Sequence, residues 1–403
     1  MDITRIWEDL SLSEGGTIVY VVLDGLGGLP RKSGGTELEE ARTPNLDRLA
    51  KESACGLLET VGPGMTPGSG PGHLALFGCD PLRYPLGRGI LSALGIDFEL
   101  REGDVAARVN FATEDEAGRV RDRRAGRIDS ETNRRLCRKI REEVTLDFEG
   151  SYFLETVSEH RAVFVLRGPD LGGALRDTDP QDTGKRPLEP EALDEGSRKT
   201  AGLVRSFLEK TGPVLACEKR ANAILLRGFD RYSPFKGLEA RFGLRGLCVA
   251  EYPMYRGISR LLGMDIAPPP EGIEGSVESL ETHFGKDHDF YFLHIKKTDS
   301  SGEDGDFDEK VCVIEKMDKL MPRVRALEPE VLVVTADHST PAVMGRHSWH
   351  PVPLMIRSRF ARVDAVEAFH EEACLRGSLG LRPGLHLMGL ALAHAGRLKK
   401  YGA

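Results

Sequence analysis

The chain has 403 residues, of which 40% are hydrophobic and 29% are charged, a composition typical of a globular protein and unlike that of a disordered chain. Lys and Arg number 55 against 63 Asp and Glu, and the resulting formal charge of −8 argues against a nucleic-acid-binding protein. No apolar run approaches the ~20 residues of a membrane span, and residues 1–12 lack the apolar core of a signal peptide, so we expect a cytoplasmic protein that does not contact a membrane.

The cysteine pattern supports the same compartment. The seven cysteines are odd in number and scattered, and no CxxC motif occurs. This pattern disfavours a disulfide framework or a structural zinc ribbon and favours a reducing environment. We interpret each cysteine as a small, buried apolar side chain.

The first hundred residues open with a strand. Residues 17–23 (TIVYVVL) form an apolar, β-branched run that predicts a buried parallel strand ending at Asp24. Residues 44–54 predict a helix, with Thr43 as N-cap and Pro44 at its first position. Residues 62–72 (GPGMTPGSGPG) predict a loop, and a short helix over 73–77 should follow it.

The middle of the chain differs in character from both ends. From about residue 103 to residue 243 it is rich in Arg and charge clusters, as in RVRDRRAGR. We expect strands over 105–111, 162–166 and 223–226, a helix over 193–208, and a loop over 168–190.

The last third of the chain again shows the apolar, strand-like runs of the first hundred residues. Short buried strands are predicted at 247–250, 290–295, 331–335 and 352–356, alternating with helices at 254–262, 307–320 and 385–395. Such alternation predicts an α/β domain with a mostly parallel sheet covered by helices on both faces. The expected architecture is a first domain of residues 1–100 and 245–403, interrupted by a smaller inserted α/β domain of residues 101–244.

Carboxylates and imidazoles stand at several strand ends of this expected sheet. In open α/β sheets, ligands bind beyond the carboxyl ends of the strands, and this mixture of side chains is typical of a site for hard to borderline divalent metals. Taken singly, a strand-end Asp is more often a turn or cap residue, and a lone His is more often an ordinary hydrogen-bonded side chain. The coincidence favours a metal site, whose strand-end candidates are Asp24, Asp299, Glu303, Asp304, Asp306, Asp337, His338, His347 and His350.

A candidate nucleophile lies in the glycine-rich loop. Ser69, in PGSGPG, stands just before the predicted short helix, whose N-terminal N–H groups suit an anion. A metal ion can lower the pKa of its hydroxyl and so activate it. Without its neighbours, the same segment would be read as a flexible linker. Two other functions are disfavoured, because Pro30 interrupts a dinucleotide fingerprint after Asp24 and no GxSxG surrounds Ser69.

Taken together, six blocks resemble one family: VVLDGLGG, TPNLDRLA, GMTPGSGPGHLALFGCDP, HIKKTDSSGEDGDFDEKV, VTADHSTP and HSWHPVPLMI. In order and spacing they resemble the archaeal-type cofactor-independent (2,3-bisphosphoglycerate-independent) phosphoglycerate mutases of the alkaline phosphatase superfamily. The resemblance implies an alkaline-phosphatase-like metal-binding domain and an inserted transferase domain that binds substrate.

The resemblance also implies a two-metal site. Asp24, Ser69, Asp337 and His338 match one metal site, with Ser69 as the phosphorylated nucleophile, and Asp299 and His347 match the second. The family usually has a histidine where this chain has Glu303, which leaves the identity of the metal open. The expected cofactors are two divalent ions, with Mn²⁺ as the first choice and Zn²⁺, Co²⁺ or Mg²⁺ as alternatives.

The implied reaction interconverts 3-phosphoglycerate and 2-phosphoglycerate, a step of glycolysis and gluconeogenesis, through phosphoserine and without 2,3-bisphosphoglycerate. Closure of the inserted domain would keep water from hydrolysing the phosphoserine. Arginines of the insertion are expected to hold the carboxylate and phosphate of the phosphoglycerate, although solvated arginines are the commoner case. The candidate substrate-binding residues are His73, Arg108, Asn110, Arg123, Arg127, Arg161, Arg227 and, in place of a lysine that the broader group has near its metals, Arg256.

Two other functions stay open. One is a metal-dependent phosphate or phosphonate monoester hydrolase on the same scaffold, which would deliver the phosphoryl group to water. The arginine-rich insertion favours the mutase, because a hydrolase does not need to retain a small acid. The other is a non-catalytic metal-regulated binding protein, which the presence of Ser69 beside the metal ligands disfavours.

Overall fold

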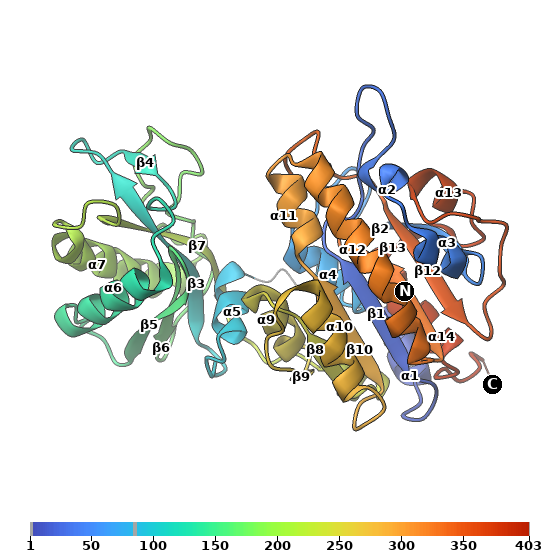
Figure 1. Cartoon of the computed structure of the whole chain (residues 1–403). Coiled ribbons are helices and arrows are strands. Elements are labelled where there is room, and N and C mark those ends of the chain that lie inside the picture. Colours follow the sequence, from blue (N-terminus) through green and yellow to red (C-terminus); the bar gives the residue numbers. More distant parts are fainter. Residues whose placement is uncertain (1–2, 84–86, 403) are drawn as a thin grey trace. The chain divides into compact units, whose positions relative to one another are not determined.

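A computed structural model describes residues 3–83 and 87–402 (Figure 1). The described chain divides into two units, a larger one of residues 3–83 and 236–402 and a smaller one of residues 87–235. Within the described residues, no helix is both long and apolar enough to cross a membrane.

The boundaries of the insertion lie earlier than the predicted 100/101 and 244/245. The helix α5 (Arg88–Gly95) packs against β3 (Val105–Glu114) and β7 (Ala223–Arg231), and the backbone N–H of Gly87 donates to Asp230 at 2.8 Å. These contacts join α5 to the smaller unit, although its sequence looked like a continuation of the first domain.

The larger unit is built on an eight-stranded sheet in the order β13-β2-β12-β11-β1-β10-β8-β9. All neighbouring pairs run parallel except those of β12, which is antiparallel to both β11 and β2, so the predicted mostly parallel sheet is confirmed. The strands are β1 (Ile18–Leu23), β2 (Ala54–Glu59), β8 (Gly246–Val249), β9 (Asp265–Ile266), β10 (Phe290–Ile295), β11 (Val331–Thr335), β12 (Val352–Ser358) and β13 (Gly380–Pro383).

Helices cover both faces of this sheet (Figure 1). A long helix, α12 (Phe307–Ala326), packs with its neighbours α2, α3, α10 and α11, while α4 packs with α9 and α14. The remaining helices of this unit are α1 (Ile3–Leu10), α2 (Glu37–Glu40), α3 (Pro44–Ala50), α4 (Ser69–Leu76), α8 (Leu238–Phe242), α9 (Pro253–Leu261), α10 (Gly272–His283), α11 (Lys297–Glu303), α13 (Glu371–Leu375) and α14 (Leu387–His394), preceded by a 3₁₀ turn at Gly384–His386.

The central strands are buried on both faces. Every residue of β1, β10 and β11 is buried, as the continuous apolar, β-branched runs predict for the middle of a parallel sheet. The predicted strands of the last third match β8, β10, β11 and β12 closely. Helices α9, α12 and α14 confirm the predicted helices, with α12 extending six residues further, to Ala326.

The smaller unit contains an antiparallel sheet in the order β4-β3-β6-β5. The strand β7 also pairs with β3, in the antiparallel direction. Helices α6 and α7 pack against one face through a core that includes Phe111, Leu136, Phe164 and Phe207. The other elements of this unit are β4 (Val120–Asp122), β5 (Ser151–Ser158), β6 (Arg161–Arg167), α6 (Ser130–Glu143), α7 (Arg198–Leu215) and a 3₁₀ turn at Glu195–Ser197.

The cysteine interpretation needs one correction. All seven side chains are free thiols, and five are buried, but Cys217 and Cys312 are exposed. Cys312 lies on α12 just before Val313 and Ile314, which face the core, so its own side chain points to solvent. A small side chain at such an outward position costs little, and the expectation of burial is wrong for these two.

The start of α3 shows how a buried acid replaces a local cap. Thr43 is the N-cap residue, as predicted, but its side chain makes no capping hydrogen bond. Asp318 of α12 does so instead: its Oδ1 accepts from the backbone N–H groups of Asn45 at 3.0 Å and Leu46 at 2.8 Å. Its Oδ2 accepts from the Asn45 side chain at 2.9 Å, so one carboxylate fixes α3 against α12.

Replacing Asp318 with Ala should therefore lower the free energy of unfolding by about 2–3 kcal/mol, because a cap is lost and buried N–H groups are left without an acceptor. Both tryptophans, Trp7 and Trp349, belong to the larger unit, so their fluorescence during urea unfolding reports on it. Asp308→Ala is the control: on the same helix, its side chain is 85% exposed, and we expect a change below about 0.5 kcal/mol. Equal unfolding midpoints for Asp318→Ala and the unaltered protein would contradict the capping role.

Candidate active site

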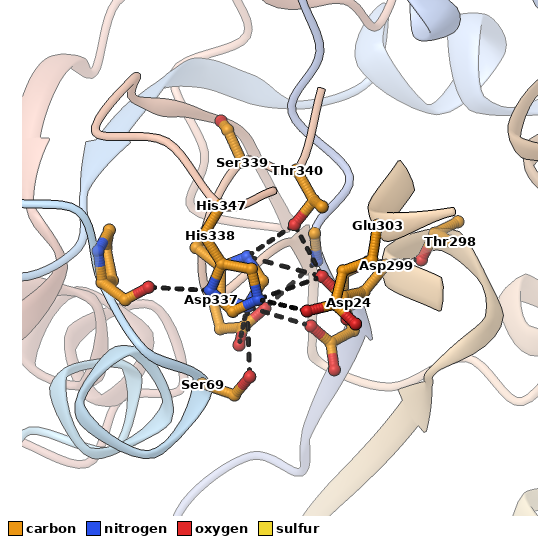
Figure 2. A network of polar contacts seen from close by, with 12 residues as sticks. Asp24, Ser69, Thr298, Asp299, Glu303, Asp337, His338, Ser339, Thr340 and His347 are labelled. Carbon is orange, nitrogen blue, oxygen red and sulfur yellow. Dashed lines mark hydrogen bonds and ion pairs between the residues drawn. The ribbon is translucent and has the colours of Figure 1, made fainter. Parts of the chain in front are cut away.

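The predicted metal ligands gather at one edge of the large sheet (Figure 2). Asp24 follows β1, Asp337 and His338 follow β11, and Asp299 follows β10. His347 precedes β12, and since β12 runs antiparallel to β11, its start lies at the edge where the parallel strands end. Because β12 runs in the opposite direction, His347, which precedes β12, lies beside the residues that follow the parallel strands.

A first group consists of Asp24, Asp337 and His338, whose ligand atoms all lie within 4.8 Å of one another. His338 Nε2 is 3.3 Å from Asp24 Oδ1 and 3.2 Å from Asp337 Oδ2. Both carboxylate oxygens are buried and accept no hydrogen bond. Buried anionic oxygens without donors, facing an imidazole nitrogen, fit a divalent cation of the hard to borderline kind.

A second group consists of Asp299, His338 and His347, so His338 belongs to both groups rather than to the first alone. His347 Nε2 lies 3.4 Å from Asp299 Oδ1 and 3.6 Å from Glu303 Oε1. The other ring nitrogen, Nδ1, donates to the carbonyl of Pro67 at 2.9 Å, which directs Nε2 towards the two carboxylates. This donor set also fits a divalent cation.

Asp299 and Glu303 do not lie in a loop, although the glycine-rich segment that contains them looked like one. They lie on α11, four residues apart, which places both side chains on the same side of the helix. Asp299 is fully buried, whereas the side chain of Glu303 is 56% exposed. Glu303 therefore lies between the second group and solvent.

Ser69 lies beside the first group. Its Oγ is 3.2 Å from His338 Nε2 (Figure 2). The expected short helix begins at Ser69 rather than after it, so the hydroxyl stands in the first turn of α4. Gly72 allows this close approach, since a Cβ there would lie 2.5 Å from the Asp337 carbonyl oxygen. In this turn Pro71 has no N–H and that of Gly72 donates to the Gly68 carbonyl at 3.0 Å, so the N–H groups of Ser69 and Gly70 are the ones that suit a phosphoryl oxygen.

Lys296, which the sequence analysis did not consider, lies between the two groups. Its Nζ is 3.2 Å from Asp24 Oδ2 and also contacts Asp299 Oδ2. The signal was available in the sequence, because Lys296 stands three residues before Asp299 and directly after β10. Asp24 Oδ2 accepts further hydrogen bonds from Tyr255 and His294, also overlooked, so Oδ1 is the oxygen that points towards a cation.

Electrostatics set the protonation of these groups. Burial raises the pKa of Asp24, but Lys296, His294 and His338 together outweigh burial and hold that pKa well below its usual range. Burial lowers the pKa of Lys296, yet Asp24 and Asp299 raise it overall, so the lysine stays cationic. Burial lowers the pKa of His338, which stays neutral, as a metal ligand must. Burial lowers that of His347, but Glu303 and Asp299 raise it to about 9, so a cation bound there displaces a proton.

Neither metal-binding group includes the two other predicted residues of this unit, His73 and Arg256. His73 is buried on α4; its Nδ1 donates to the Ser69 carbonyl at 2.8 Å and lies 3.1 Å from Asp337 Oδ2. The guanidinium of Arg256 hydrogen-bonds the backbone carbonyls of Ala250 and Ala267, at 3.5 and 2.9 Å. Lys296, rather than Arg256, is the cationic side chain that contacts the aspartates.

Four of the predicted residues in the smaller unit share one face of its sheet. Arg108 and Asn110 are two residues apart on β3, Arg108 pairs with Arg227 on β7, and Asn110 pairs with Arg161 on β6. Residues that pair directly, or lie two apart, point to the same side. The buried core residues Val109 and Phe111 alternate with them and face the helices.

The charge on this face is reflected in His160, which is buried at the turn before β6. Burial, and then the charges of Arg161, Arg124, Arg108 and Arg127, lower its pKa to about 3. Two of these arginines, Arg108 and Arg161, belong to the shared face of the sheet, and their guanidinium groups supply positive charge that suits an anion.

Arg123, Arg127 and Arg227 differ in their surroundings. Arg123 donates through Nε and Nη2 to the two oxygens of Asp179, at 2.9 and 2.7 Å, so its planar fork is occupied. Arg227 Nη1 lies 3.5 Å from the same carboxylate. Arg127 lines an open cavity of about 550 Å³ together with Lys219 and Arg220.

Comparisons with known proteins agree with this geometry. The family model of 2,3-bisphosphoglycerate-independent phosphoglycerate mutase matches residues 50–220. A Thermus thermophilus protein named as a probable mutase of that kind is 49% identical, with 100% of both chains covered. One from Aquifex aeolicus is 46% identical over 98% of this chain and 99% of its own.

Solved structures give the same result. A Pyrococcus horikoshii protein superposes with a TM-score of 0.80 at 28% identity, covering 96% of this chain and all of its own. The cofactor-independent phosphoglycerate mutase from Thermoplasma acidophilum superposes with a TM-score of 0.69 at 30% identity, covering 94% of this chain and all of its own. The chain therefore belongs to the 2,3-bisphosphoglycerate-independent phosphoglycerate mutases, a family of isomerases.

Proposed function

We propose that this protein interconverts 3-phosphoglycerate and 2-phosphoglycerate by transferring the phosphoryl group to Ser69 and back, at a site that holds two divalent cations. The observation that carries the proposal is the position of the Ser69 hydroxyl, 3.2 Å from His338 Nε2 and beside the donor-free oxygens of Asp24 and Asp337. A structural serine would not need three buried ionisable groups around its hydroxyl.

Asp24, Asp337 and His338 would hold one cation near Ser69, and Asp299, His347 and Glu303 would hold the other. Such ions, when bound, supply positive charge that lowers the pKa of a nearby hydroxyl and stabilises phosphoryl oxygens. We propose Mn²⁺ as the resident ion, because carboxylates outnumber imidazoles in this set and Glu303 adds another oxygen ligand.

The chain's own residues account for the other steps. Ser69 Oγ attacks the phosphorus of 3-phosphoglycerate; a bond from Oγ to phosphorus forms as the bond to the C3 oxygen breaks, and in the net transfer the proton lost by the Ser69 hydroxyl is balanced by the one that the C3 oxygen gains. The glycerate then reorients, and its C2 hydroxyl attacks the phosphoserine and restores Ser69. Lys296 and the first-turn N–H groups of α4 are placed to stabilise charge on the phosphoryl oxygens.

Retention of glycerate between the two transfers is the task that distinguishes a mutase from a hydrolase. The arginine face of the smaller unit supports retention, since guanidinium groups bind carboxylates in a planar, bidentate manner. We propose that Arg108, Asn110, Arg161 and Arg227 bind the substrate carboxylate, and that Arg123 supports them through Asp179. Seven free thiols among the described residues fit the proposed cytoplasmic location.

Ser69→Ala should abolish the activity. In an enolase-coupled assay with 3-phosphoglycerate and Mn²⁺, and with no 2,3-bisphosphoglycerate, we expect a loss of about 10⁴-fold or more in kcat, because the nucleophile is removed. The unaltered protein should also carry phosphate on the peptide that contains Ser69, detectable by mass spectrometry after rapid quenching. Ser276→Ala, which removes another buried hydroxyl of the same unit, is the control.

Two results would contradict the mutase. Undiminished activity of Ser69→Ala would exclude the phosphoserine. Release of inorganic phosphate as the main product of the unaltered protein would instead support the phosphatase alternative.

Arg161→Met should raise KM for 3-phosphoglycerate by about 10–100-fold, because a charge-assisted hydrogen bond to the carboxylate is lost. The control is Arg135→Met on α6, where Arg135 pairs with Glu218 at 2.8 Å and faces solvent. Steady-state kinetics separate KM from kcat. An unchanged KM in Arg161→Met would remove Arg161 from the substrate site.

Glu303→His should shift the preferred metal. An imidazole in place of a carboxylate favours Zn²⁺ over Mn²⁺, so the ratio of the Zn²⁺ to the Mn²⁺ dissociation constant should fall by about tenfold or more. Titration calorimetry of the metal-free protein measures this ratio directly, with Asp308→His as the control at an exposed position nearby. The same ratio in Glu303→His and the unaltered protein would show that Glu303 is not a ligand.

A further inference from the structure

Thr340 lies between the two metal-binding groups and is anchored on several sides. Its backbone N–H donates to the carbonyls of Gly25, at 3.2 Å, and Gly27, at 3.0 Å, in the loop that follows β1. Its carbonyl accepts from the buried Lys310 Nζ at 2.9 Å. Thr340 is itself fully buried, so its hydroxyl has a fixed position.

The space around the hydroxyl is closed as well. Gly25 has a φ of +65°, and a Cβ at Gly25 would lie 2.5 Å from Thr340 Oγ1 and 2.9 Å from Asp299 Oδ1. A side chain at this position would therefore displace both groups. The absence of one beside Asp24 brings the Thr340 hydroxyl and the Asp299 carboxylate into direct contact.

The Thr340 hydroxyl makes two polar contacts, one with Asp299 and one with His338 (Figure 2). Thr340 Oγ1 donates to Asp299 Oδ1 at 2.6 Å and lies 3.0 Å from His338 Nδ1. A hydroxyl has one hydrogen, and an ionised carboxylate can only accept. With its hydrogen given to Asp299, Thr340 can only accept from His338, so Nδ1 of His338 carries the ring hydrogen.

The tautomer of His338 decides which metal group it can serve. If Nδ1 is the donor to Thr340, the lone pair of the neutral ring is on Nε2, which faces Asp24 Oδ1, Asp337 Oδ2 and Ser69 Oγ. Nδ1 is then unable to ligate a cation held by Asp299, from whose Oδ1 it is 4.0 Å away. The apparent membership of His338 in both groups is thereby resolved in favour of the first.

We propose that Thr340 is a positioning residue that fixes the tautomer of His338, assigns that histidine to the cation beside Ser69, and orients Asp299 for the other cation. The inference rests on the proposed two-cation site for its functional meaning, but the tautomer itself is a property of the metal-free protein. It also explains why the second group needs Glu303 as a ligand, since His338 is engaged elsewhere.

The first test is the tautomer. In protein labelled with ¹⁵N-histidine and free of metal, the ring nitrogens of His338 should show a protonated Nδ1 and an unprotonated Nε2, with the signals identified by their loss in His338→Gln. In Thr340→Val the preference for the Nδ1–H form should diminish, because its acceptor is removed. A protonated Nε2 in the unaltered protein would overturn the inference, whatever metals the protein binds.

The second test is metal affinity, measured with Mn²⁺ by titration calorimetry and by electron paramagnetic resonance of the free ion. We expect Thr340→Val to bind Mn²⁺ about 10–100-fold more weakly, the usual effect of removing a group that orients a metal ligand. Thr340→Ser, which keeps the hydroxyl, should restore the affinity to within a few-fold. The matched control is Thr335→Val, which removes a buried hydroxyl that donates to the Pro353 carbonyl at 2.8 Å and should leave Mn²⁺ affinity unchanged.

The outcomes separate this inference from the proposed function. If Thr340→Val folds and binds two Mn²⁺ ions as tightly as the unaltered protein does, the positioning role is wrong while the two-cation site stands. If the unaltered protein binds fewer than two ions, the two-cation site is wrong, and the tautomer measurement alone decides the role of Thr340. Loss of Mn²⁺ affinity in both Thr340→Val and Thr335→Val would overturn the specific role, because any lost buried hydroxyl would then have the same effect.

Discussion

Three carboxylates, of Asp24, Asp299 and Asp337, are fully buried at one edge of a parallel sheet. An ionised carboxylate in a protein interior is very costly unless opposite charge or several donors compensate it. Lys296 contacts two of the three, and His338 stays neutral, so negative charge remains in excess at the site. In the function that we propose, this excess attracts divalent cations, whose charge would then allow an anionic phosphate ester to approach.

The sheet provides the rigidity that this arrangement needs. Central strands buried on both faces fix the starting points of the loops that carry the acids, and the antiparallel β12 brings His347 to the same edge. Outer contacts then select one oxygen or nitrogen of each ligand: Tyr255, His294 and Lys296 occupy one oxygen of Asp24, and the Pro67 carbonyl occupies one nitrogen of His347. Ligand atoms are thus directed before any ion binds.

The sequence predicted those parts of the molecule where a segment's own residue pattern favours the same structure as its surroundings in the fold. Continuous β-branched runs gave the central strands, and the acids and imidazoles at their ends gave the metal groups that the structure brings together. Elements with weaker patterns were missed. Helix α6 was hidden in a charged stretch, although Asn133, Leu136 and Ile140 recur at helical spacing and are buried. Helix α11 was missed because glycine and serine resemble a loop. The contact of Thr340 with Asp299 joins segments far apart in the chain, which no local pattern reveals, whereas Lys296 could have been found from its place three residues before Asp299.

The position of the insertion has a consequence for biosynthesis. The strands that flank β1 in the sheet, β10 and β11, follow the entire smaller unit in the chain. A growing polypeptide therefore presents β1, a fully apolar strand, long before its hydrogen-bonding neighbours have left the ribosome, while residues 87–235 already contain every strand of their own sheet. Unpaired apolar strands are prone to aggregate, so the nascent chain depends on shielding of its first segment until the last third has been translated.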